Sequence, residues 1–370
     1  MKIVDLCAYA PKSAIKAGEA IKDGKYIFFT SSDDESKRYS DYQHNCEAII
    51  MGTGGNATLH YYNGKFSTST DCIVLLPNES IRCKFLYYFF LHNIAVLQKG
   101  FKGAGLKHTN KNYINNIEIN TVPDIETQDK VIKALDLACN LVRFHQQQLK
   151  KLDELVKSRF IELFGDPANN SPKWDTGRLG DYMTTLTDFS ANGSYALLDS
   201  QVVMYDEPHY AIMVRTTDLE TGDFKNGVKY IDQKAYELLG KSKLFGGEMI
   251  MNKIGSAGKI YLMPHIETPA SLGRNAFMFR FDQRVNIVFL YALLTSEYGT
   301  AEIQQHVRGA VAKTITKEST RSIRIIVPPI ELQEQFATFV EQTDKSKFVI
   351  QQALDKAQLL FDSLMQKYFG

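Results

Sequence analysis

Two segments of the chain decide its fold: PDIETQDKVIKALDLACNLVRFHQQQLKKLDELVKSRFIELFG (123–165) and PPIELQEQFATFVEQTDKSKFVIQQALDKAQLLFDSLMQKYFG (328–370). The shared positions keep one shift of 205 residues: Pro123, Ile125, Gln128, Ser158 and Phe164 return as Pro328, Ile330, Gln333, Ser363 and Phe369. A constant shift means that neither copy contains an insertion, as expected for a rigid element. The chain therefore contains an internal repeat.

Weaker matches extend the repeat upstream in the same order: Asp5-Leu6 with Asp181-Tyr182, Ile49–Gly55 with Met249–Gly258, Phe85-Leu86-Tyr87 with Phe289-Leu290-Tyr291, and Lys102-Gly103-Ala104 with Arg308-Gly309-Ala310. The shift falls to 176 near the two starts, so the second copy carries about 29 additional residues in its first half. We predict five parts: a globular domain (1–122), a central helix (123–165), a linker (166–173), a second globular domain (174–327) and a distal helix (328–370).

The two repeated segments have the periodicity of long helices. Their seam positions alternate at spacings of three and four, the heptad pattern of a coiled coil, when His145 and Arg159 in the first copy and Thr343 and Lys347 in the second are counted with the apolar residues. The apolar residues are Val131, Leu135, Ala138, Val142, Leu149, Leu152, Val156 and Leu163 in the first copy, and Phe336, Val340, Ile350, Leu354, Ala357, Phe361, Leu364 and Tyr368 in the second. A helix over 126–164 would be roughly 58 Å long at ~1.5 Å per residue.

Polar residues interrupt the two seams at different places. His145 and Arg159 interrupt the first seam, and Thr343 and Lys347 interrupt the second. Because a buried unpaired charge is costly, this mismatch favours pairing of the two different helices of one chain. Such a pair, related by a pseudo-two-fold axis, would run antiparallel. Pairing of like helices in a homodimer is the alternative.

The remaining sequence has mixed patterning. Four stretches are typical of strands and two of short buried helices: 25–32, 71–77, 209–217 and 275–281 for strands, and 85–92 and 287–299 for helices. We therefore predict an α+β fold, with two mixed α/β domains separated by two long antiparallel helices that form an intramolecular coiled coil.

Composition and missing motifs exclude several classes of protein. The net charge of +1 excludes a uniformly basic chain, and the five cysteines form no CxxC pair. No apolar run is long enough for a membrane span, and the first residues lack a signal-peptide core, so we expect a cytoplasmic protein without a membrane partner. There is no phosphate-binding GxxxxGK[ST] loop, no GxGxxG after a strand and no HExxH. These absences predict a non-catalytic chain without a metal site.

Basic, glycine-rich loops carry the candidate chemistry in both copies. The stretch 99–111 has four lysines and no acidic residue, and 307–317 is its counterpart. Phosphate contacts need Lys, Arg and accessible backbone N–H groups, and base edges need polar side chains on positioned loops. The predicted DNA contacts are Thr53, Asn56, Lys102, Lys107 and His108 in the first copy, and Asn252, Lys253, Ser256, Lys259, Arg274, Asn275, Arg308, Lys313 and Thr314 in the second.

These residues and the helices resemble a known family. The segment LDELVKSRFIELFGDP (152–167), after a helix that begins at a Pro-x-x-x-x-Gln element, resembles the central region of specificity subunits of type I restriction-modification systems. Residues 328–370 resemble the distal region of those subunits. Ile250–Lys259, followed by Arg274-Asn275, is similar to their target-recognition domain.

The resemblance implies a non-enzymatic reader of double-stranded DNA. Each recognition domain would contact one half of a bipartite, asymmetric target, and the helices would set the gap between the halves. Two methyltransferase subunits and the restriction subunits would be the partners. This chain would hold no cofactor, whereas S-adenosylmethionine, ATP and Mg²⁺ would serve the partner subunits.

Two other functions stay open from the residues alone. One is a nuclease or methyltransferase whose active site has no recognised motif. The other is a coiled-coil adaptor that does not contact DNA, although the repeated basic loops argue against it.

Overall fold

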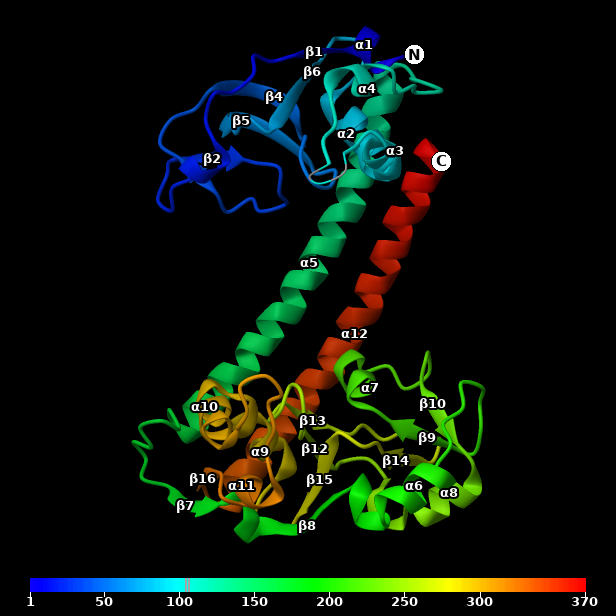
Figure 1. Cartoon of the computed structure of the whole chain (residues 1–370). Helices are drawn as coiled ribbons and strands as arrows, with labels where there is room; N and C mark the ends of the chain where they lie inside the picture. The colour runs from blue at the N-terminus through cyan, green and yellow to red at the C-terminus, as the bar shows by residue number, and fades with distance from the viewer. Residues whose placement is uncertain (104, 106) are drawn as a thin grey trace. The chain divides into compact units, whose positions relative to one another are not determined.

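The computed structural model describes residues 1–103, 105 and 107–370 (Figure 1). The chain forms two compact units, of which the first is built from two segments distant in the sequence. Unit 1 contains Met1–Leu149 and Val349–Gly370, and unit 2 contains Lys150–Phe348. Ala104, part of one predicted match between the copies, lies outside the described residues.

Unit 1 contains a six-stranded sheet in the order β1-β6-β4-β5-β2-β3. All neighbours are antiparallel except β2 and β5, which are parallel. The strands are β1 (Cys7–Tyr9), β2 (Tyr26–Phe29), β3 (Arg38–Tyr39), β4 (His44–Gly52), β5 (Leu59–Thr68) and β6 (Cys72–Pro77). The helices are α1 (Ile3–Leu6), η1 (Ala17–Glu19), α2 (Cys83–His92), α3 (Ile94–Lys99) and α4 (Lys111–Asn115).

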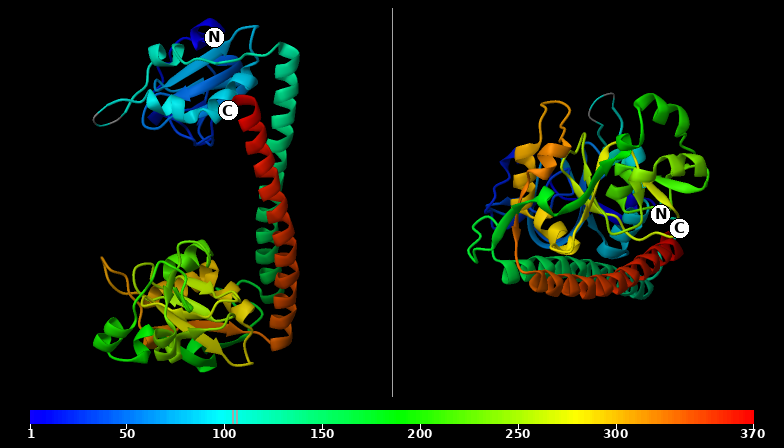
Figure 2. Two further views of the ribbon diagram at one scale, coloured as in Figure 1. Left: turned by 90° about the vertical axis from the view of Figure 1, so that its right-hand side faces the viewer. Right: turned by 90° about the horizontal axis from the view of Figure 1, so that it is seen from below.

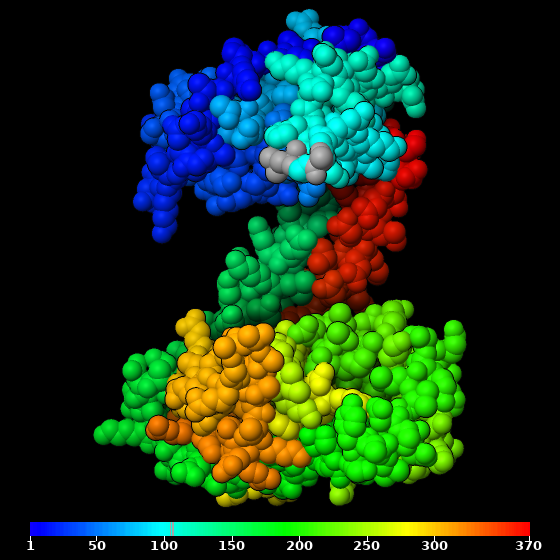
Figure 3. Space-filling view, in the orientation of Figure 1, coloured from blue at the N-terminus to red at the C-terminus, as the bar shows by residue number. Residues whose placement is uncertain are grey.

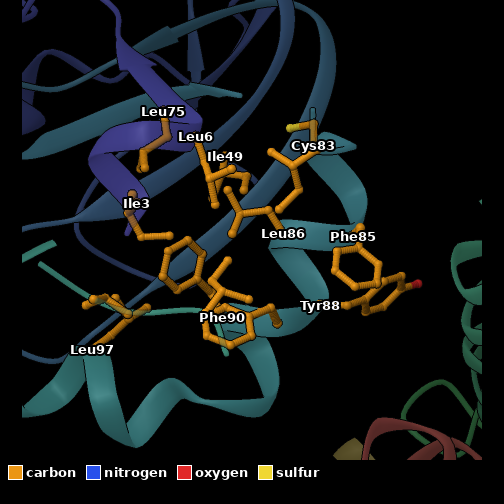
Figure 4. Packing of buried hydrophobic residues seen from close by; sticks show 14 of the residues in the cluster. Ile3, Leu6, Ile49, Leu75, Cys83, Phe85, Leu86, Tyr88, Phe90 and Leu97 are labelled. Carbon is orange, nitrogen blue, oxygen red and sulfur yellow. The ribbon is translucent and has the colours of Figure 1, made fainter. Parts of the chain in front are cut away.

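Both faces of this sheet are buried. Along β4, Ile49 and Met51 pack into the cluster formed with α2, whereas Ile50 packs into a second cluster on the other face with Phe29 and Phe66. This alternation is the two-residue period of a strand. Figure 4 shows the first cluster, in which side chains of α1, β4, β6 and α2 converge.

Unit 2 contains the same arrangement with one strand broken. One sheet has the order β13-β12-β15-β8, another β10-β9-β14-β11, and β16 pairs with β7. The strands are β7 (Asp175–Arg178), β8 (Met183–Asp188), β9 (Ala211–Val214), β10 (Lys229–Ile231), β11 (Lys243–Leu244), β12 (Met249–Asn252), β13 (Ile260–Leu262), β14 (Ala270–Leu272), β15 (Ala276–Phe281) and β16 (Arg324–Val327). The helices are η2 (Leu179–Tyr182), η3 (Phe189–Asn192), α6 (Tyr195–Gln201), α7 (Thr216–Thr221), α8 (Gln233–Leu238), η4 (Gly240–Ser242), α9 (Ile287–Thr295), α10 (Glu297–His306) and α11 (Lys317–Arg321).

Strand pairing relates the two units element by element. β4 and β6 correspond to β12 and β15, and the parallel pair β2/β5 recurs as the parallel pair β9/β14. The long strand β5 is therefore divided into β13 and β14. The additional residues of the second copy include α6 between β8 and β9, α7 between β9 and β10, and α8 between β10 and β11.

The weakest predicted match is also supported by the hydrogen bonds. Asp5 accepts a hydrogen bond from the backbone N–H of Lys2 at 3.1 Å, and Asp181 accepts one from Arg178 at the same distance. Each carboxylate caps its own first turn. The two copies therefore begin alike although their sequences have diverged.

The predicted long helices are α5 (Ile125–Phe164) and α12 (Ile330–Phe369), and the repeated glutamine explains how each begins. Gln128 is fully buried; its Oε1 accepts from the backbone N–H of Arg82 at 2.7 Å, and its Nε2 donates to the Pro123 carbonyl at 2.8 Å. Gln333 makes the same pair of contacts, with Asn286 at 2.8 Å and Pro328 at 2.7 Å. Each glutamine thus joins the start of a long helix to the start of α2 or α9.

The far end of each long helix packs in the unit where the other helix begins. In unit 2, Phe164 at the end of α5 lies against Phe289 of α9, with ring centroids 4.7 Å apart. In unit 1, Phe369 at the end of α12 lies against Phe85 of α2, with centroids 5.1 Å apart. Within each unit the two helices therefore run antiparallel, as predicted, and the α+β fold class is confirmed (Figures 1 and 2).

Two of the four polar seam residues, Lys347 and Arg159, find partners on the other helix, whereas His145 and Thr343 form hydrogen bonds within their own helices. In unit 2, Lys347 of α12 forms an ion pair with Asp153 of α5 at 2.8 Å, and the Arg159 guanidinium lies over the Phe339 ring. These contacts support the prediction that unlike helices pair. Phe160, outside the predicted seam, is only 5% exposed, because α9 covers that side of α5.

Two predicted elements differ from the structure. The predicted strand 209–217 is shortened to β9, because α7 begins at Thr216. The predicted helix 287–299 is divided between α9 and α10. Ser296 separates them, and its hydroxyl caps α10 by accepting from the backbone N–H of Gly299 at 3.1 Å.

Candidate nucleic-acid interface

A short hairpin projects from each unit, between α3 and α4 in unit 1 and between α10 and α11 in unit 2. In unit 1, Lys102 and His108 exchange two backbone hydrogen bonds of 3.0 Å. In unit 2, Arg308 and Thr314 exchange two of 2.8 and 2.7 Å. The predicted match of Lys102 with Arg308 is therefore confirmed in backbone geometry.

A second loop, which follows β4 or β12, holds each hairpin in place. In unit 1 the N–H of Gly55 donates to the Lys107 carbonyl at 2.9 Å, and the N–H of Thr109 donates to Thr53 at 3.0 Å. In unit 2 Gly255 donates to Lys313 at 3.0 Å, and Ile315 donates to Lys253 at 3.1 Å. The hairpin and this central loop, residues 53–58 or 253–259, are called the hairpin site of each unit below.

The hairpin site of unit 1 presents free polar and basic groups. Lys102, Lys107, His108 and Asn56 are exposed, and Thr53 is half-buried with its hydroxyl donating to the Asp71 carbonyl at 3.0 Å. Across the part of the chain that the structure describes, no carboxylate forms an ion pair with Lys102 or Lys107. The structure therefore brings together all five residues predicted in the first copy.

The hairpin site of unit 2 has its central cations tied to carboxylates. Lys253 and Lys317 both contact Asp188, at 3.0 and 2.8 Å, and Asp188 is only 6% exposed. Burial alone raises the pKa of Asp188, but the hydrogen bonds from Lys317 and Lys253 outweigh it and hold this pKa below its usual range. If the register of β1 is extended by two residues past Tyr9, Pro11 of unit 1 takes the position of Asp188.

Two further predicted cations of unit 2 are also paired. Lys259 contacts Glu220 of α7 at 3.0 Å, and Arg274 contacts Asp199 of α6 at 2.9 Å. The Arg274 guanidinium also lies over the Phe189 and Tyr195 rings. Both carboxylates lie on helices of the additional residues.

The other predicted residues of unit 2 fall into two groups. Arg308, Lys313, Ser256 and Asn275 are exposed and Thr314 is half-buried, and no ion pair joins Arg308 or Lys313 to any residue that the structure describes. Asn252 is 1% exposed, and its amide donates to the Ser256 hydroxyl at 2.8 Å and to Tyr261 at 3.2 Å. In this conformation Asn252 holds the central loop, and its side chain does not reach the surface.

Sequence reasoning missed Asp188 and Lys317, which the predicted contact set does not include. Lys317 lies at the end of the basic stretch 307–317, so its charge was visible, but its partner is 129 residues away in the chain. A carboxylate at the end of a strand gives no signal in one sequence.

The described residues offer neither a metal centre nor a membrane span. No group of three or more His, Cys, Asp or Glu side chains among them is placed to hold a metal ion. None of the helices described is long and apolar enough to cross a membrane.

Residues 1–154 match the sequence profile of the family described as "Type I restriction modification DNA specificity domain". The chain is related to the type I specificity subunits. The specificity subunit of the restriction enzyme MjaVIII of Methanocaldococcus jannaschii is 22% identical over 308 residues, which are 80% of this chain and 72% of that protein. A putative specificity subunit of Mycoplasma pneumoniae is 32% identical over 127 residues, 31% of this chain and 47%, less than half, of that protein.

Solved structures of type I specificity subunits share this fold. The crystal structure of an S subunit from M. genitalium aligns with a TM-score of 0.68 at 15% identity, covering 100% of this chain and 95% of that one. A structure whose description concerns complex assembly and conformational transition of a type I system aligns with a TM-score of 0.51 at 14% identity. The alignment covers 100% of this chain and 96% of that one. The resemblance predicted from the helical segments is confirmed.

Proposed function

We propose that the chain is the DNA specificity subunit of a type I restriction-modification complex and that each hairpin site contacts one half of a bipartite target. One observation carries this proposal: the same backbone-held hairpin, with free cations at Lys102 and Lys107 or at Arg308 and Lys313, recurs once in each unit. A recognition element that occurs once in each unit suits a target read as two halves.

The chemistry of the hairpin site divides between two tasks. The exposed cations of the hairpins suit phosphate contacts, which position a protein on the duplex without reading its sequence. The polar groups of the central loops and of the turn before β15, Asn56, Ser256 and Asn275, suit hydrogen bonds to base edges in the major groove. Each half-site alone offers only a few contacts. When one chain binds both half-sites, binding of the second half-site is intramolecular, and the affinity for the whole target is therefore much higher.

Catalysis would belong to partner subunits under this proposal. Two methyltransferase subunits would bring S-adenosylmethionine to the target, and restriction subunits would use ATP and Mg²⁺. Support comes from the names of the relatives, which are specificity subunits, and from a structural neighbour described in the context of complex assembly. The alternative, an enzyme without a recognised motif, predicts methylation or cleavage of DNA by the isolated chain.

Mapping of methylated adenines tests the proposal. The chain and the methyltransferase subunit of its own system are produced together in a host that lacks other adenine methylation, and the genome is sequenced with a method that detects N6-methyladenine. We expect one asymmetric motif of two short halves with a fixed gap. A contiguous motif, or methylation that does not depend on this chain, would contradict the proposal. The isolated chain with S-adenosylmethionine or Mg²⁺ is the control and should show no turnover.

A further inference from the structure

The hairpin of unit 2 carries a fully exposed valine at its tip. Val311 is 100% exposed, and its neighbours Ala310 and Ala312 are also exposed. The side chain therefore contributes no packing to the unit. In Figure 2 the hairpin stands out from the body of the unit as an orange loop, and Figure 3 shows the surrounding segment on the surface.

The base of this hairpin is fixed, although its tip is exposed. Arg308 and Thr314 close it with two backbone hydrogen bonds, and the Gly255 and Ile315 amides join it to the central loop. Gly309 has φ +98°, and a Cβ at this position would lie 2.2 Å from the Ala312 carbonyl oxygen, so only glycine fits the turn. A side chain presented from such a base reaches its target with little loss of conformational entropy.

The surroundings of Val311 define the surface that it fits. Arg308 and Lys313 flank the tip, and no carboxylate among the described residues is paired with either. A matching surface has an apolar group between negative charges. In the major groove of DNA the C5-methyl group of thymine is the apolar group, and phosphates border the groove on both sides.

We propose that Val311 contacts the C5-methyl group of a thymine in the half-site bound by unit 2, while Arg308 and Lys313 contact the flanking phosphates. This inference rests on the proposed function. It assigns one specificity-determining residue and predicts that the half-site contains a thymine, on one strand or the other, whose methyl group is read.

Unit 1 is different at the same position. The residue that corresponds to Val311 is Gly105, which has no side chain, and a Cβ built there would meet nothing within 4 Å. This hairpin therefore offers no apolar side chain at position 105.

Replacement of thymine by deoxyuridine tests the contact, because uracil lacks only the C5-methyl group and keeps every hydrogen-bonding group of thymine. The target found by methylation mapping is prepared as a duplex, and each thymine is replaced in turn. Failure of the mapping to give a bipartite motif would reject the proposed function itself and not this contact. Where the motif is found, binding of the chain together with its methyltransferase subunits to the unmodified duplex is measured first. For the intact chain we expect one replacement to weaken binding roughly fourfold, the effect of one buried methyl group.

Val311→Ala supplies the second arm of a double-mutant cycle. This variant should bind the unmodified duplex less tightly by a similar factor and should lose nothing more when that thymine is replaced. Val4→Ala, at a half-exposed valine of α1, is the matched control and should behave as the intact chain. The proposal is overturned if the two losses multiply, if Val311→Ala binds normally, or if no deoxyuridine position matters. A loss for Val311→Ala that no deoxyuridine reproduces would instead indicate a wedge between bases or a protein partner.

Discussion

The hairpin sites of unit 1 and unit 2 share a backbone and differ in charge. Both have the hairpin held by the central loop through equivalent hydrogen bonds. In unit 1 the central loop has Thr53 where unit 2 has Lys253, and Pro11 stands where unit 2 has Asp188. Unit 2 therefore contains more cations near its site, but four of them are paired with three of its own carboxylates.

This difference shows that the number of basic residues in a sequence does not measure the charge offered to a ligand. Lys253, Lys259 and Arg274 each have an internal partner at 2.9–3.0 Å. A cation that is already paired gains less from a phosphate, because the existing contact must first be broken. We expect the hairpin cations, which form no ion pair with any described residue of either unit, to dominate the salt dependence of binding.

The largest effect should follow from exchange of a whole unit-1 domain. Replacement of residues 1–122 by the corresponding part of another specificity subunit should change one half of the methylated motif completely and leave the other half unchanged. The measurement is methylation mapping, with the intact chain as control. Changes in both halves would mean that the units do not read the target separately.

Loss of the Asp188 carboxylate should affect unit 2 strongly. Asp188→Asn should destabilise this unit by about 2–3 kcal/mol, because hydrogen bonds to charged groups contribute roughly 1.5–3 kcal/mol and the lysines lose their partner. Hydrogen exchange in each unit during urea unfolding measures the change separately. Asp71→Asn, at an exposed residue of unit 1, is the control. Equal stability of Asp188→Asn and the intact chain would contradict the structural role.

The same carboxylate predicts a pH dependence. The folded state lowers the pKa of Asp188, so its stabilising effect is present above the ordinary pKa of aspartate, ~3.9, and is lost as the pH falls through the lowered value. Unit 2 should therefore lose stability in acid, and Asp188→Asn should remove this part of the pH dependence. The free energy of unfolding of unit 2 is measured for the intact chain and for Asp188→Asn, at neutral pH and below pH ~4.

Removal of one hairpin cation should have a smaller effect that is alike in both units. Lys102→Ala and Arg308→Ala should each weaken binding to all sequences and reduce the slope of log affinity against log salt concentration by about 0.9, one phosphate contact. Binding to the target and to a mutated site over a salt series measures both quantities. If affinity and slope stayed constant in both variants, the hairpins would be ordinary solvated turns.

The smallest effect should follow from removal of a complete ion pair. The double variant Lys259→Gln with Glu220→Gln keeps the net charge, and it should leave the salt slope unchanged because Lys259 is already paired. Lys102→Gln with Lys107→Gln is the matched variant at two free cations, and it should lower the slope by about two phosphate contacts. If the salt slope of the Lys259→Gln, Glu220→Gln variant fell by about one phosphate contact, Lys259 would leave Glu220 and pair with DNA in the complex.

The sequence predicted the elements that repeat with a fixed spacing. Pro123 and Gln128 recur because a buried glutamine must join two helix starts, and this requirement is the same in both copies. Lys102 and Arg308 could be aligned because Gly-Ala follows both. The pairing of Lys253 with Asp188, and the burial of Asn252, could not be predicted, because they depend on contacts between strands far apart in the sequence and on side-chain direction.

The exchange of helix ends has a consequence for synthesis of the protein on the ribosome. The core of unit 1 includes Met365, with Phe361 and Phe369 packed against it, so the part of the chain made first is completed by one of the last parts made. Until α12 emerges, the apolar faces of α2 and of the first half of α5 stay exposed. Contacts of such high sequence separation form slowly, and a nascent unit 1 would be open to capture by chaperones or by the α12 of another copy.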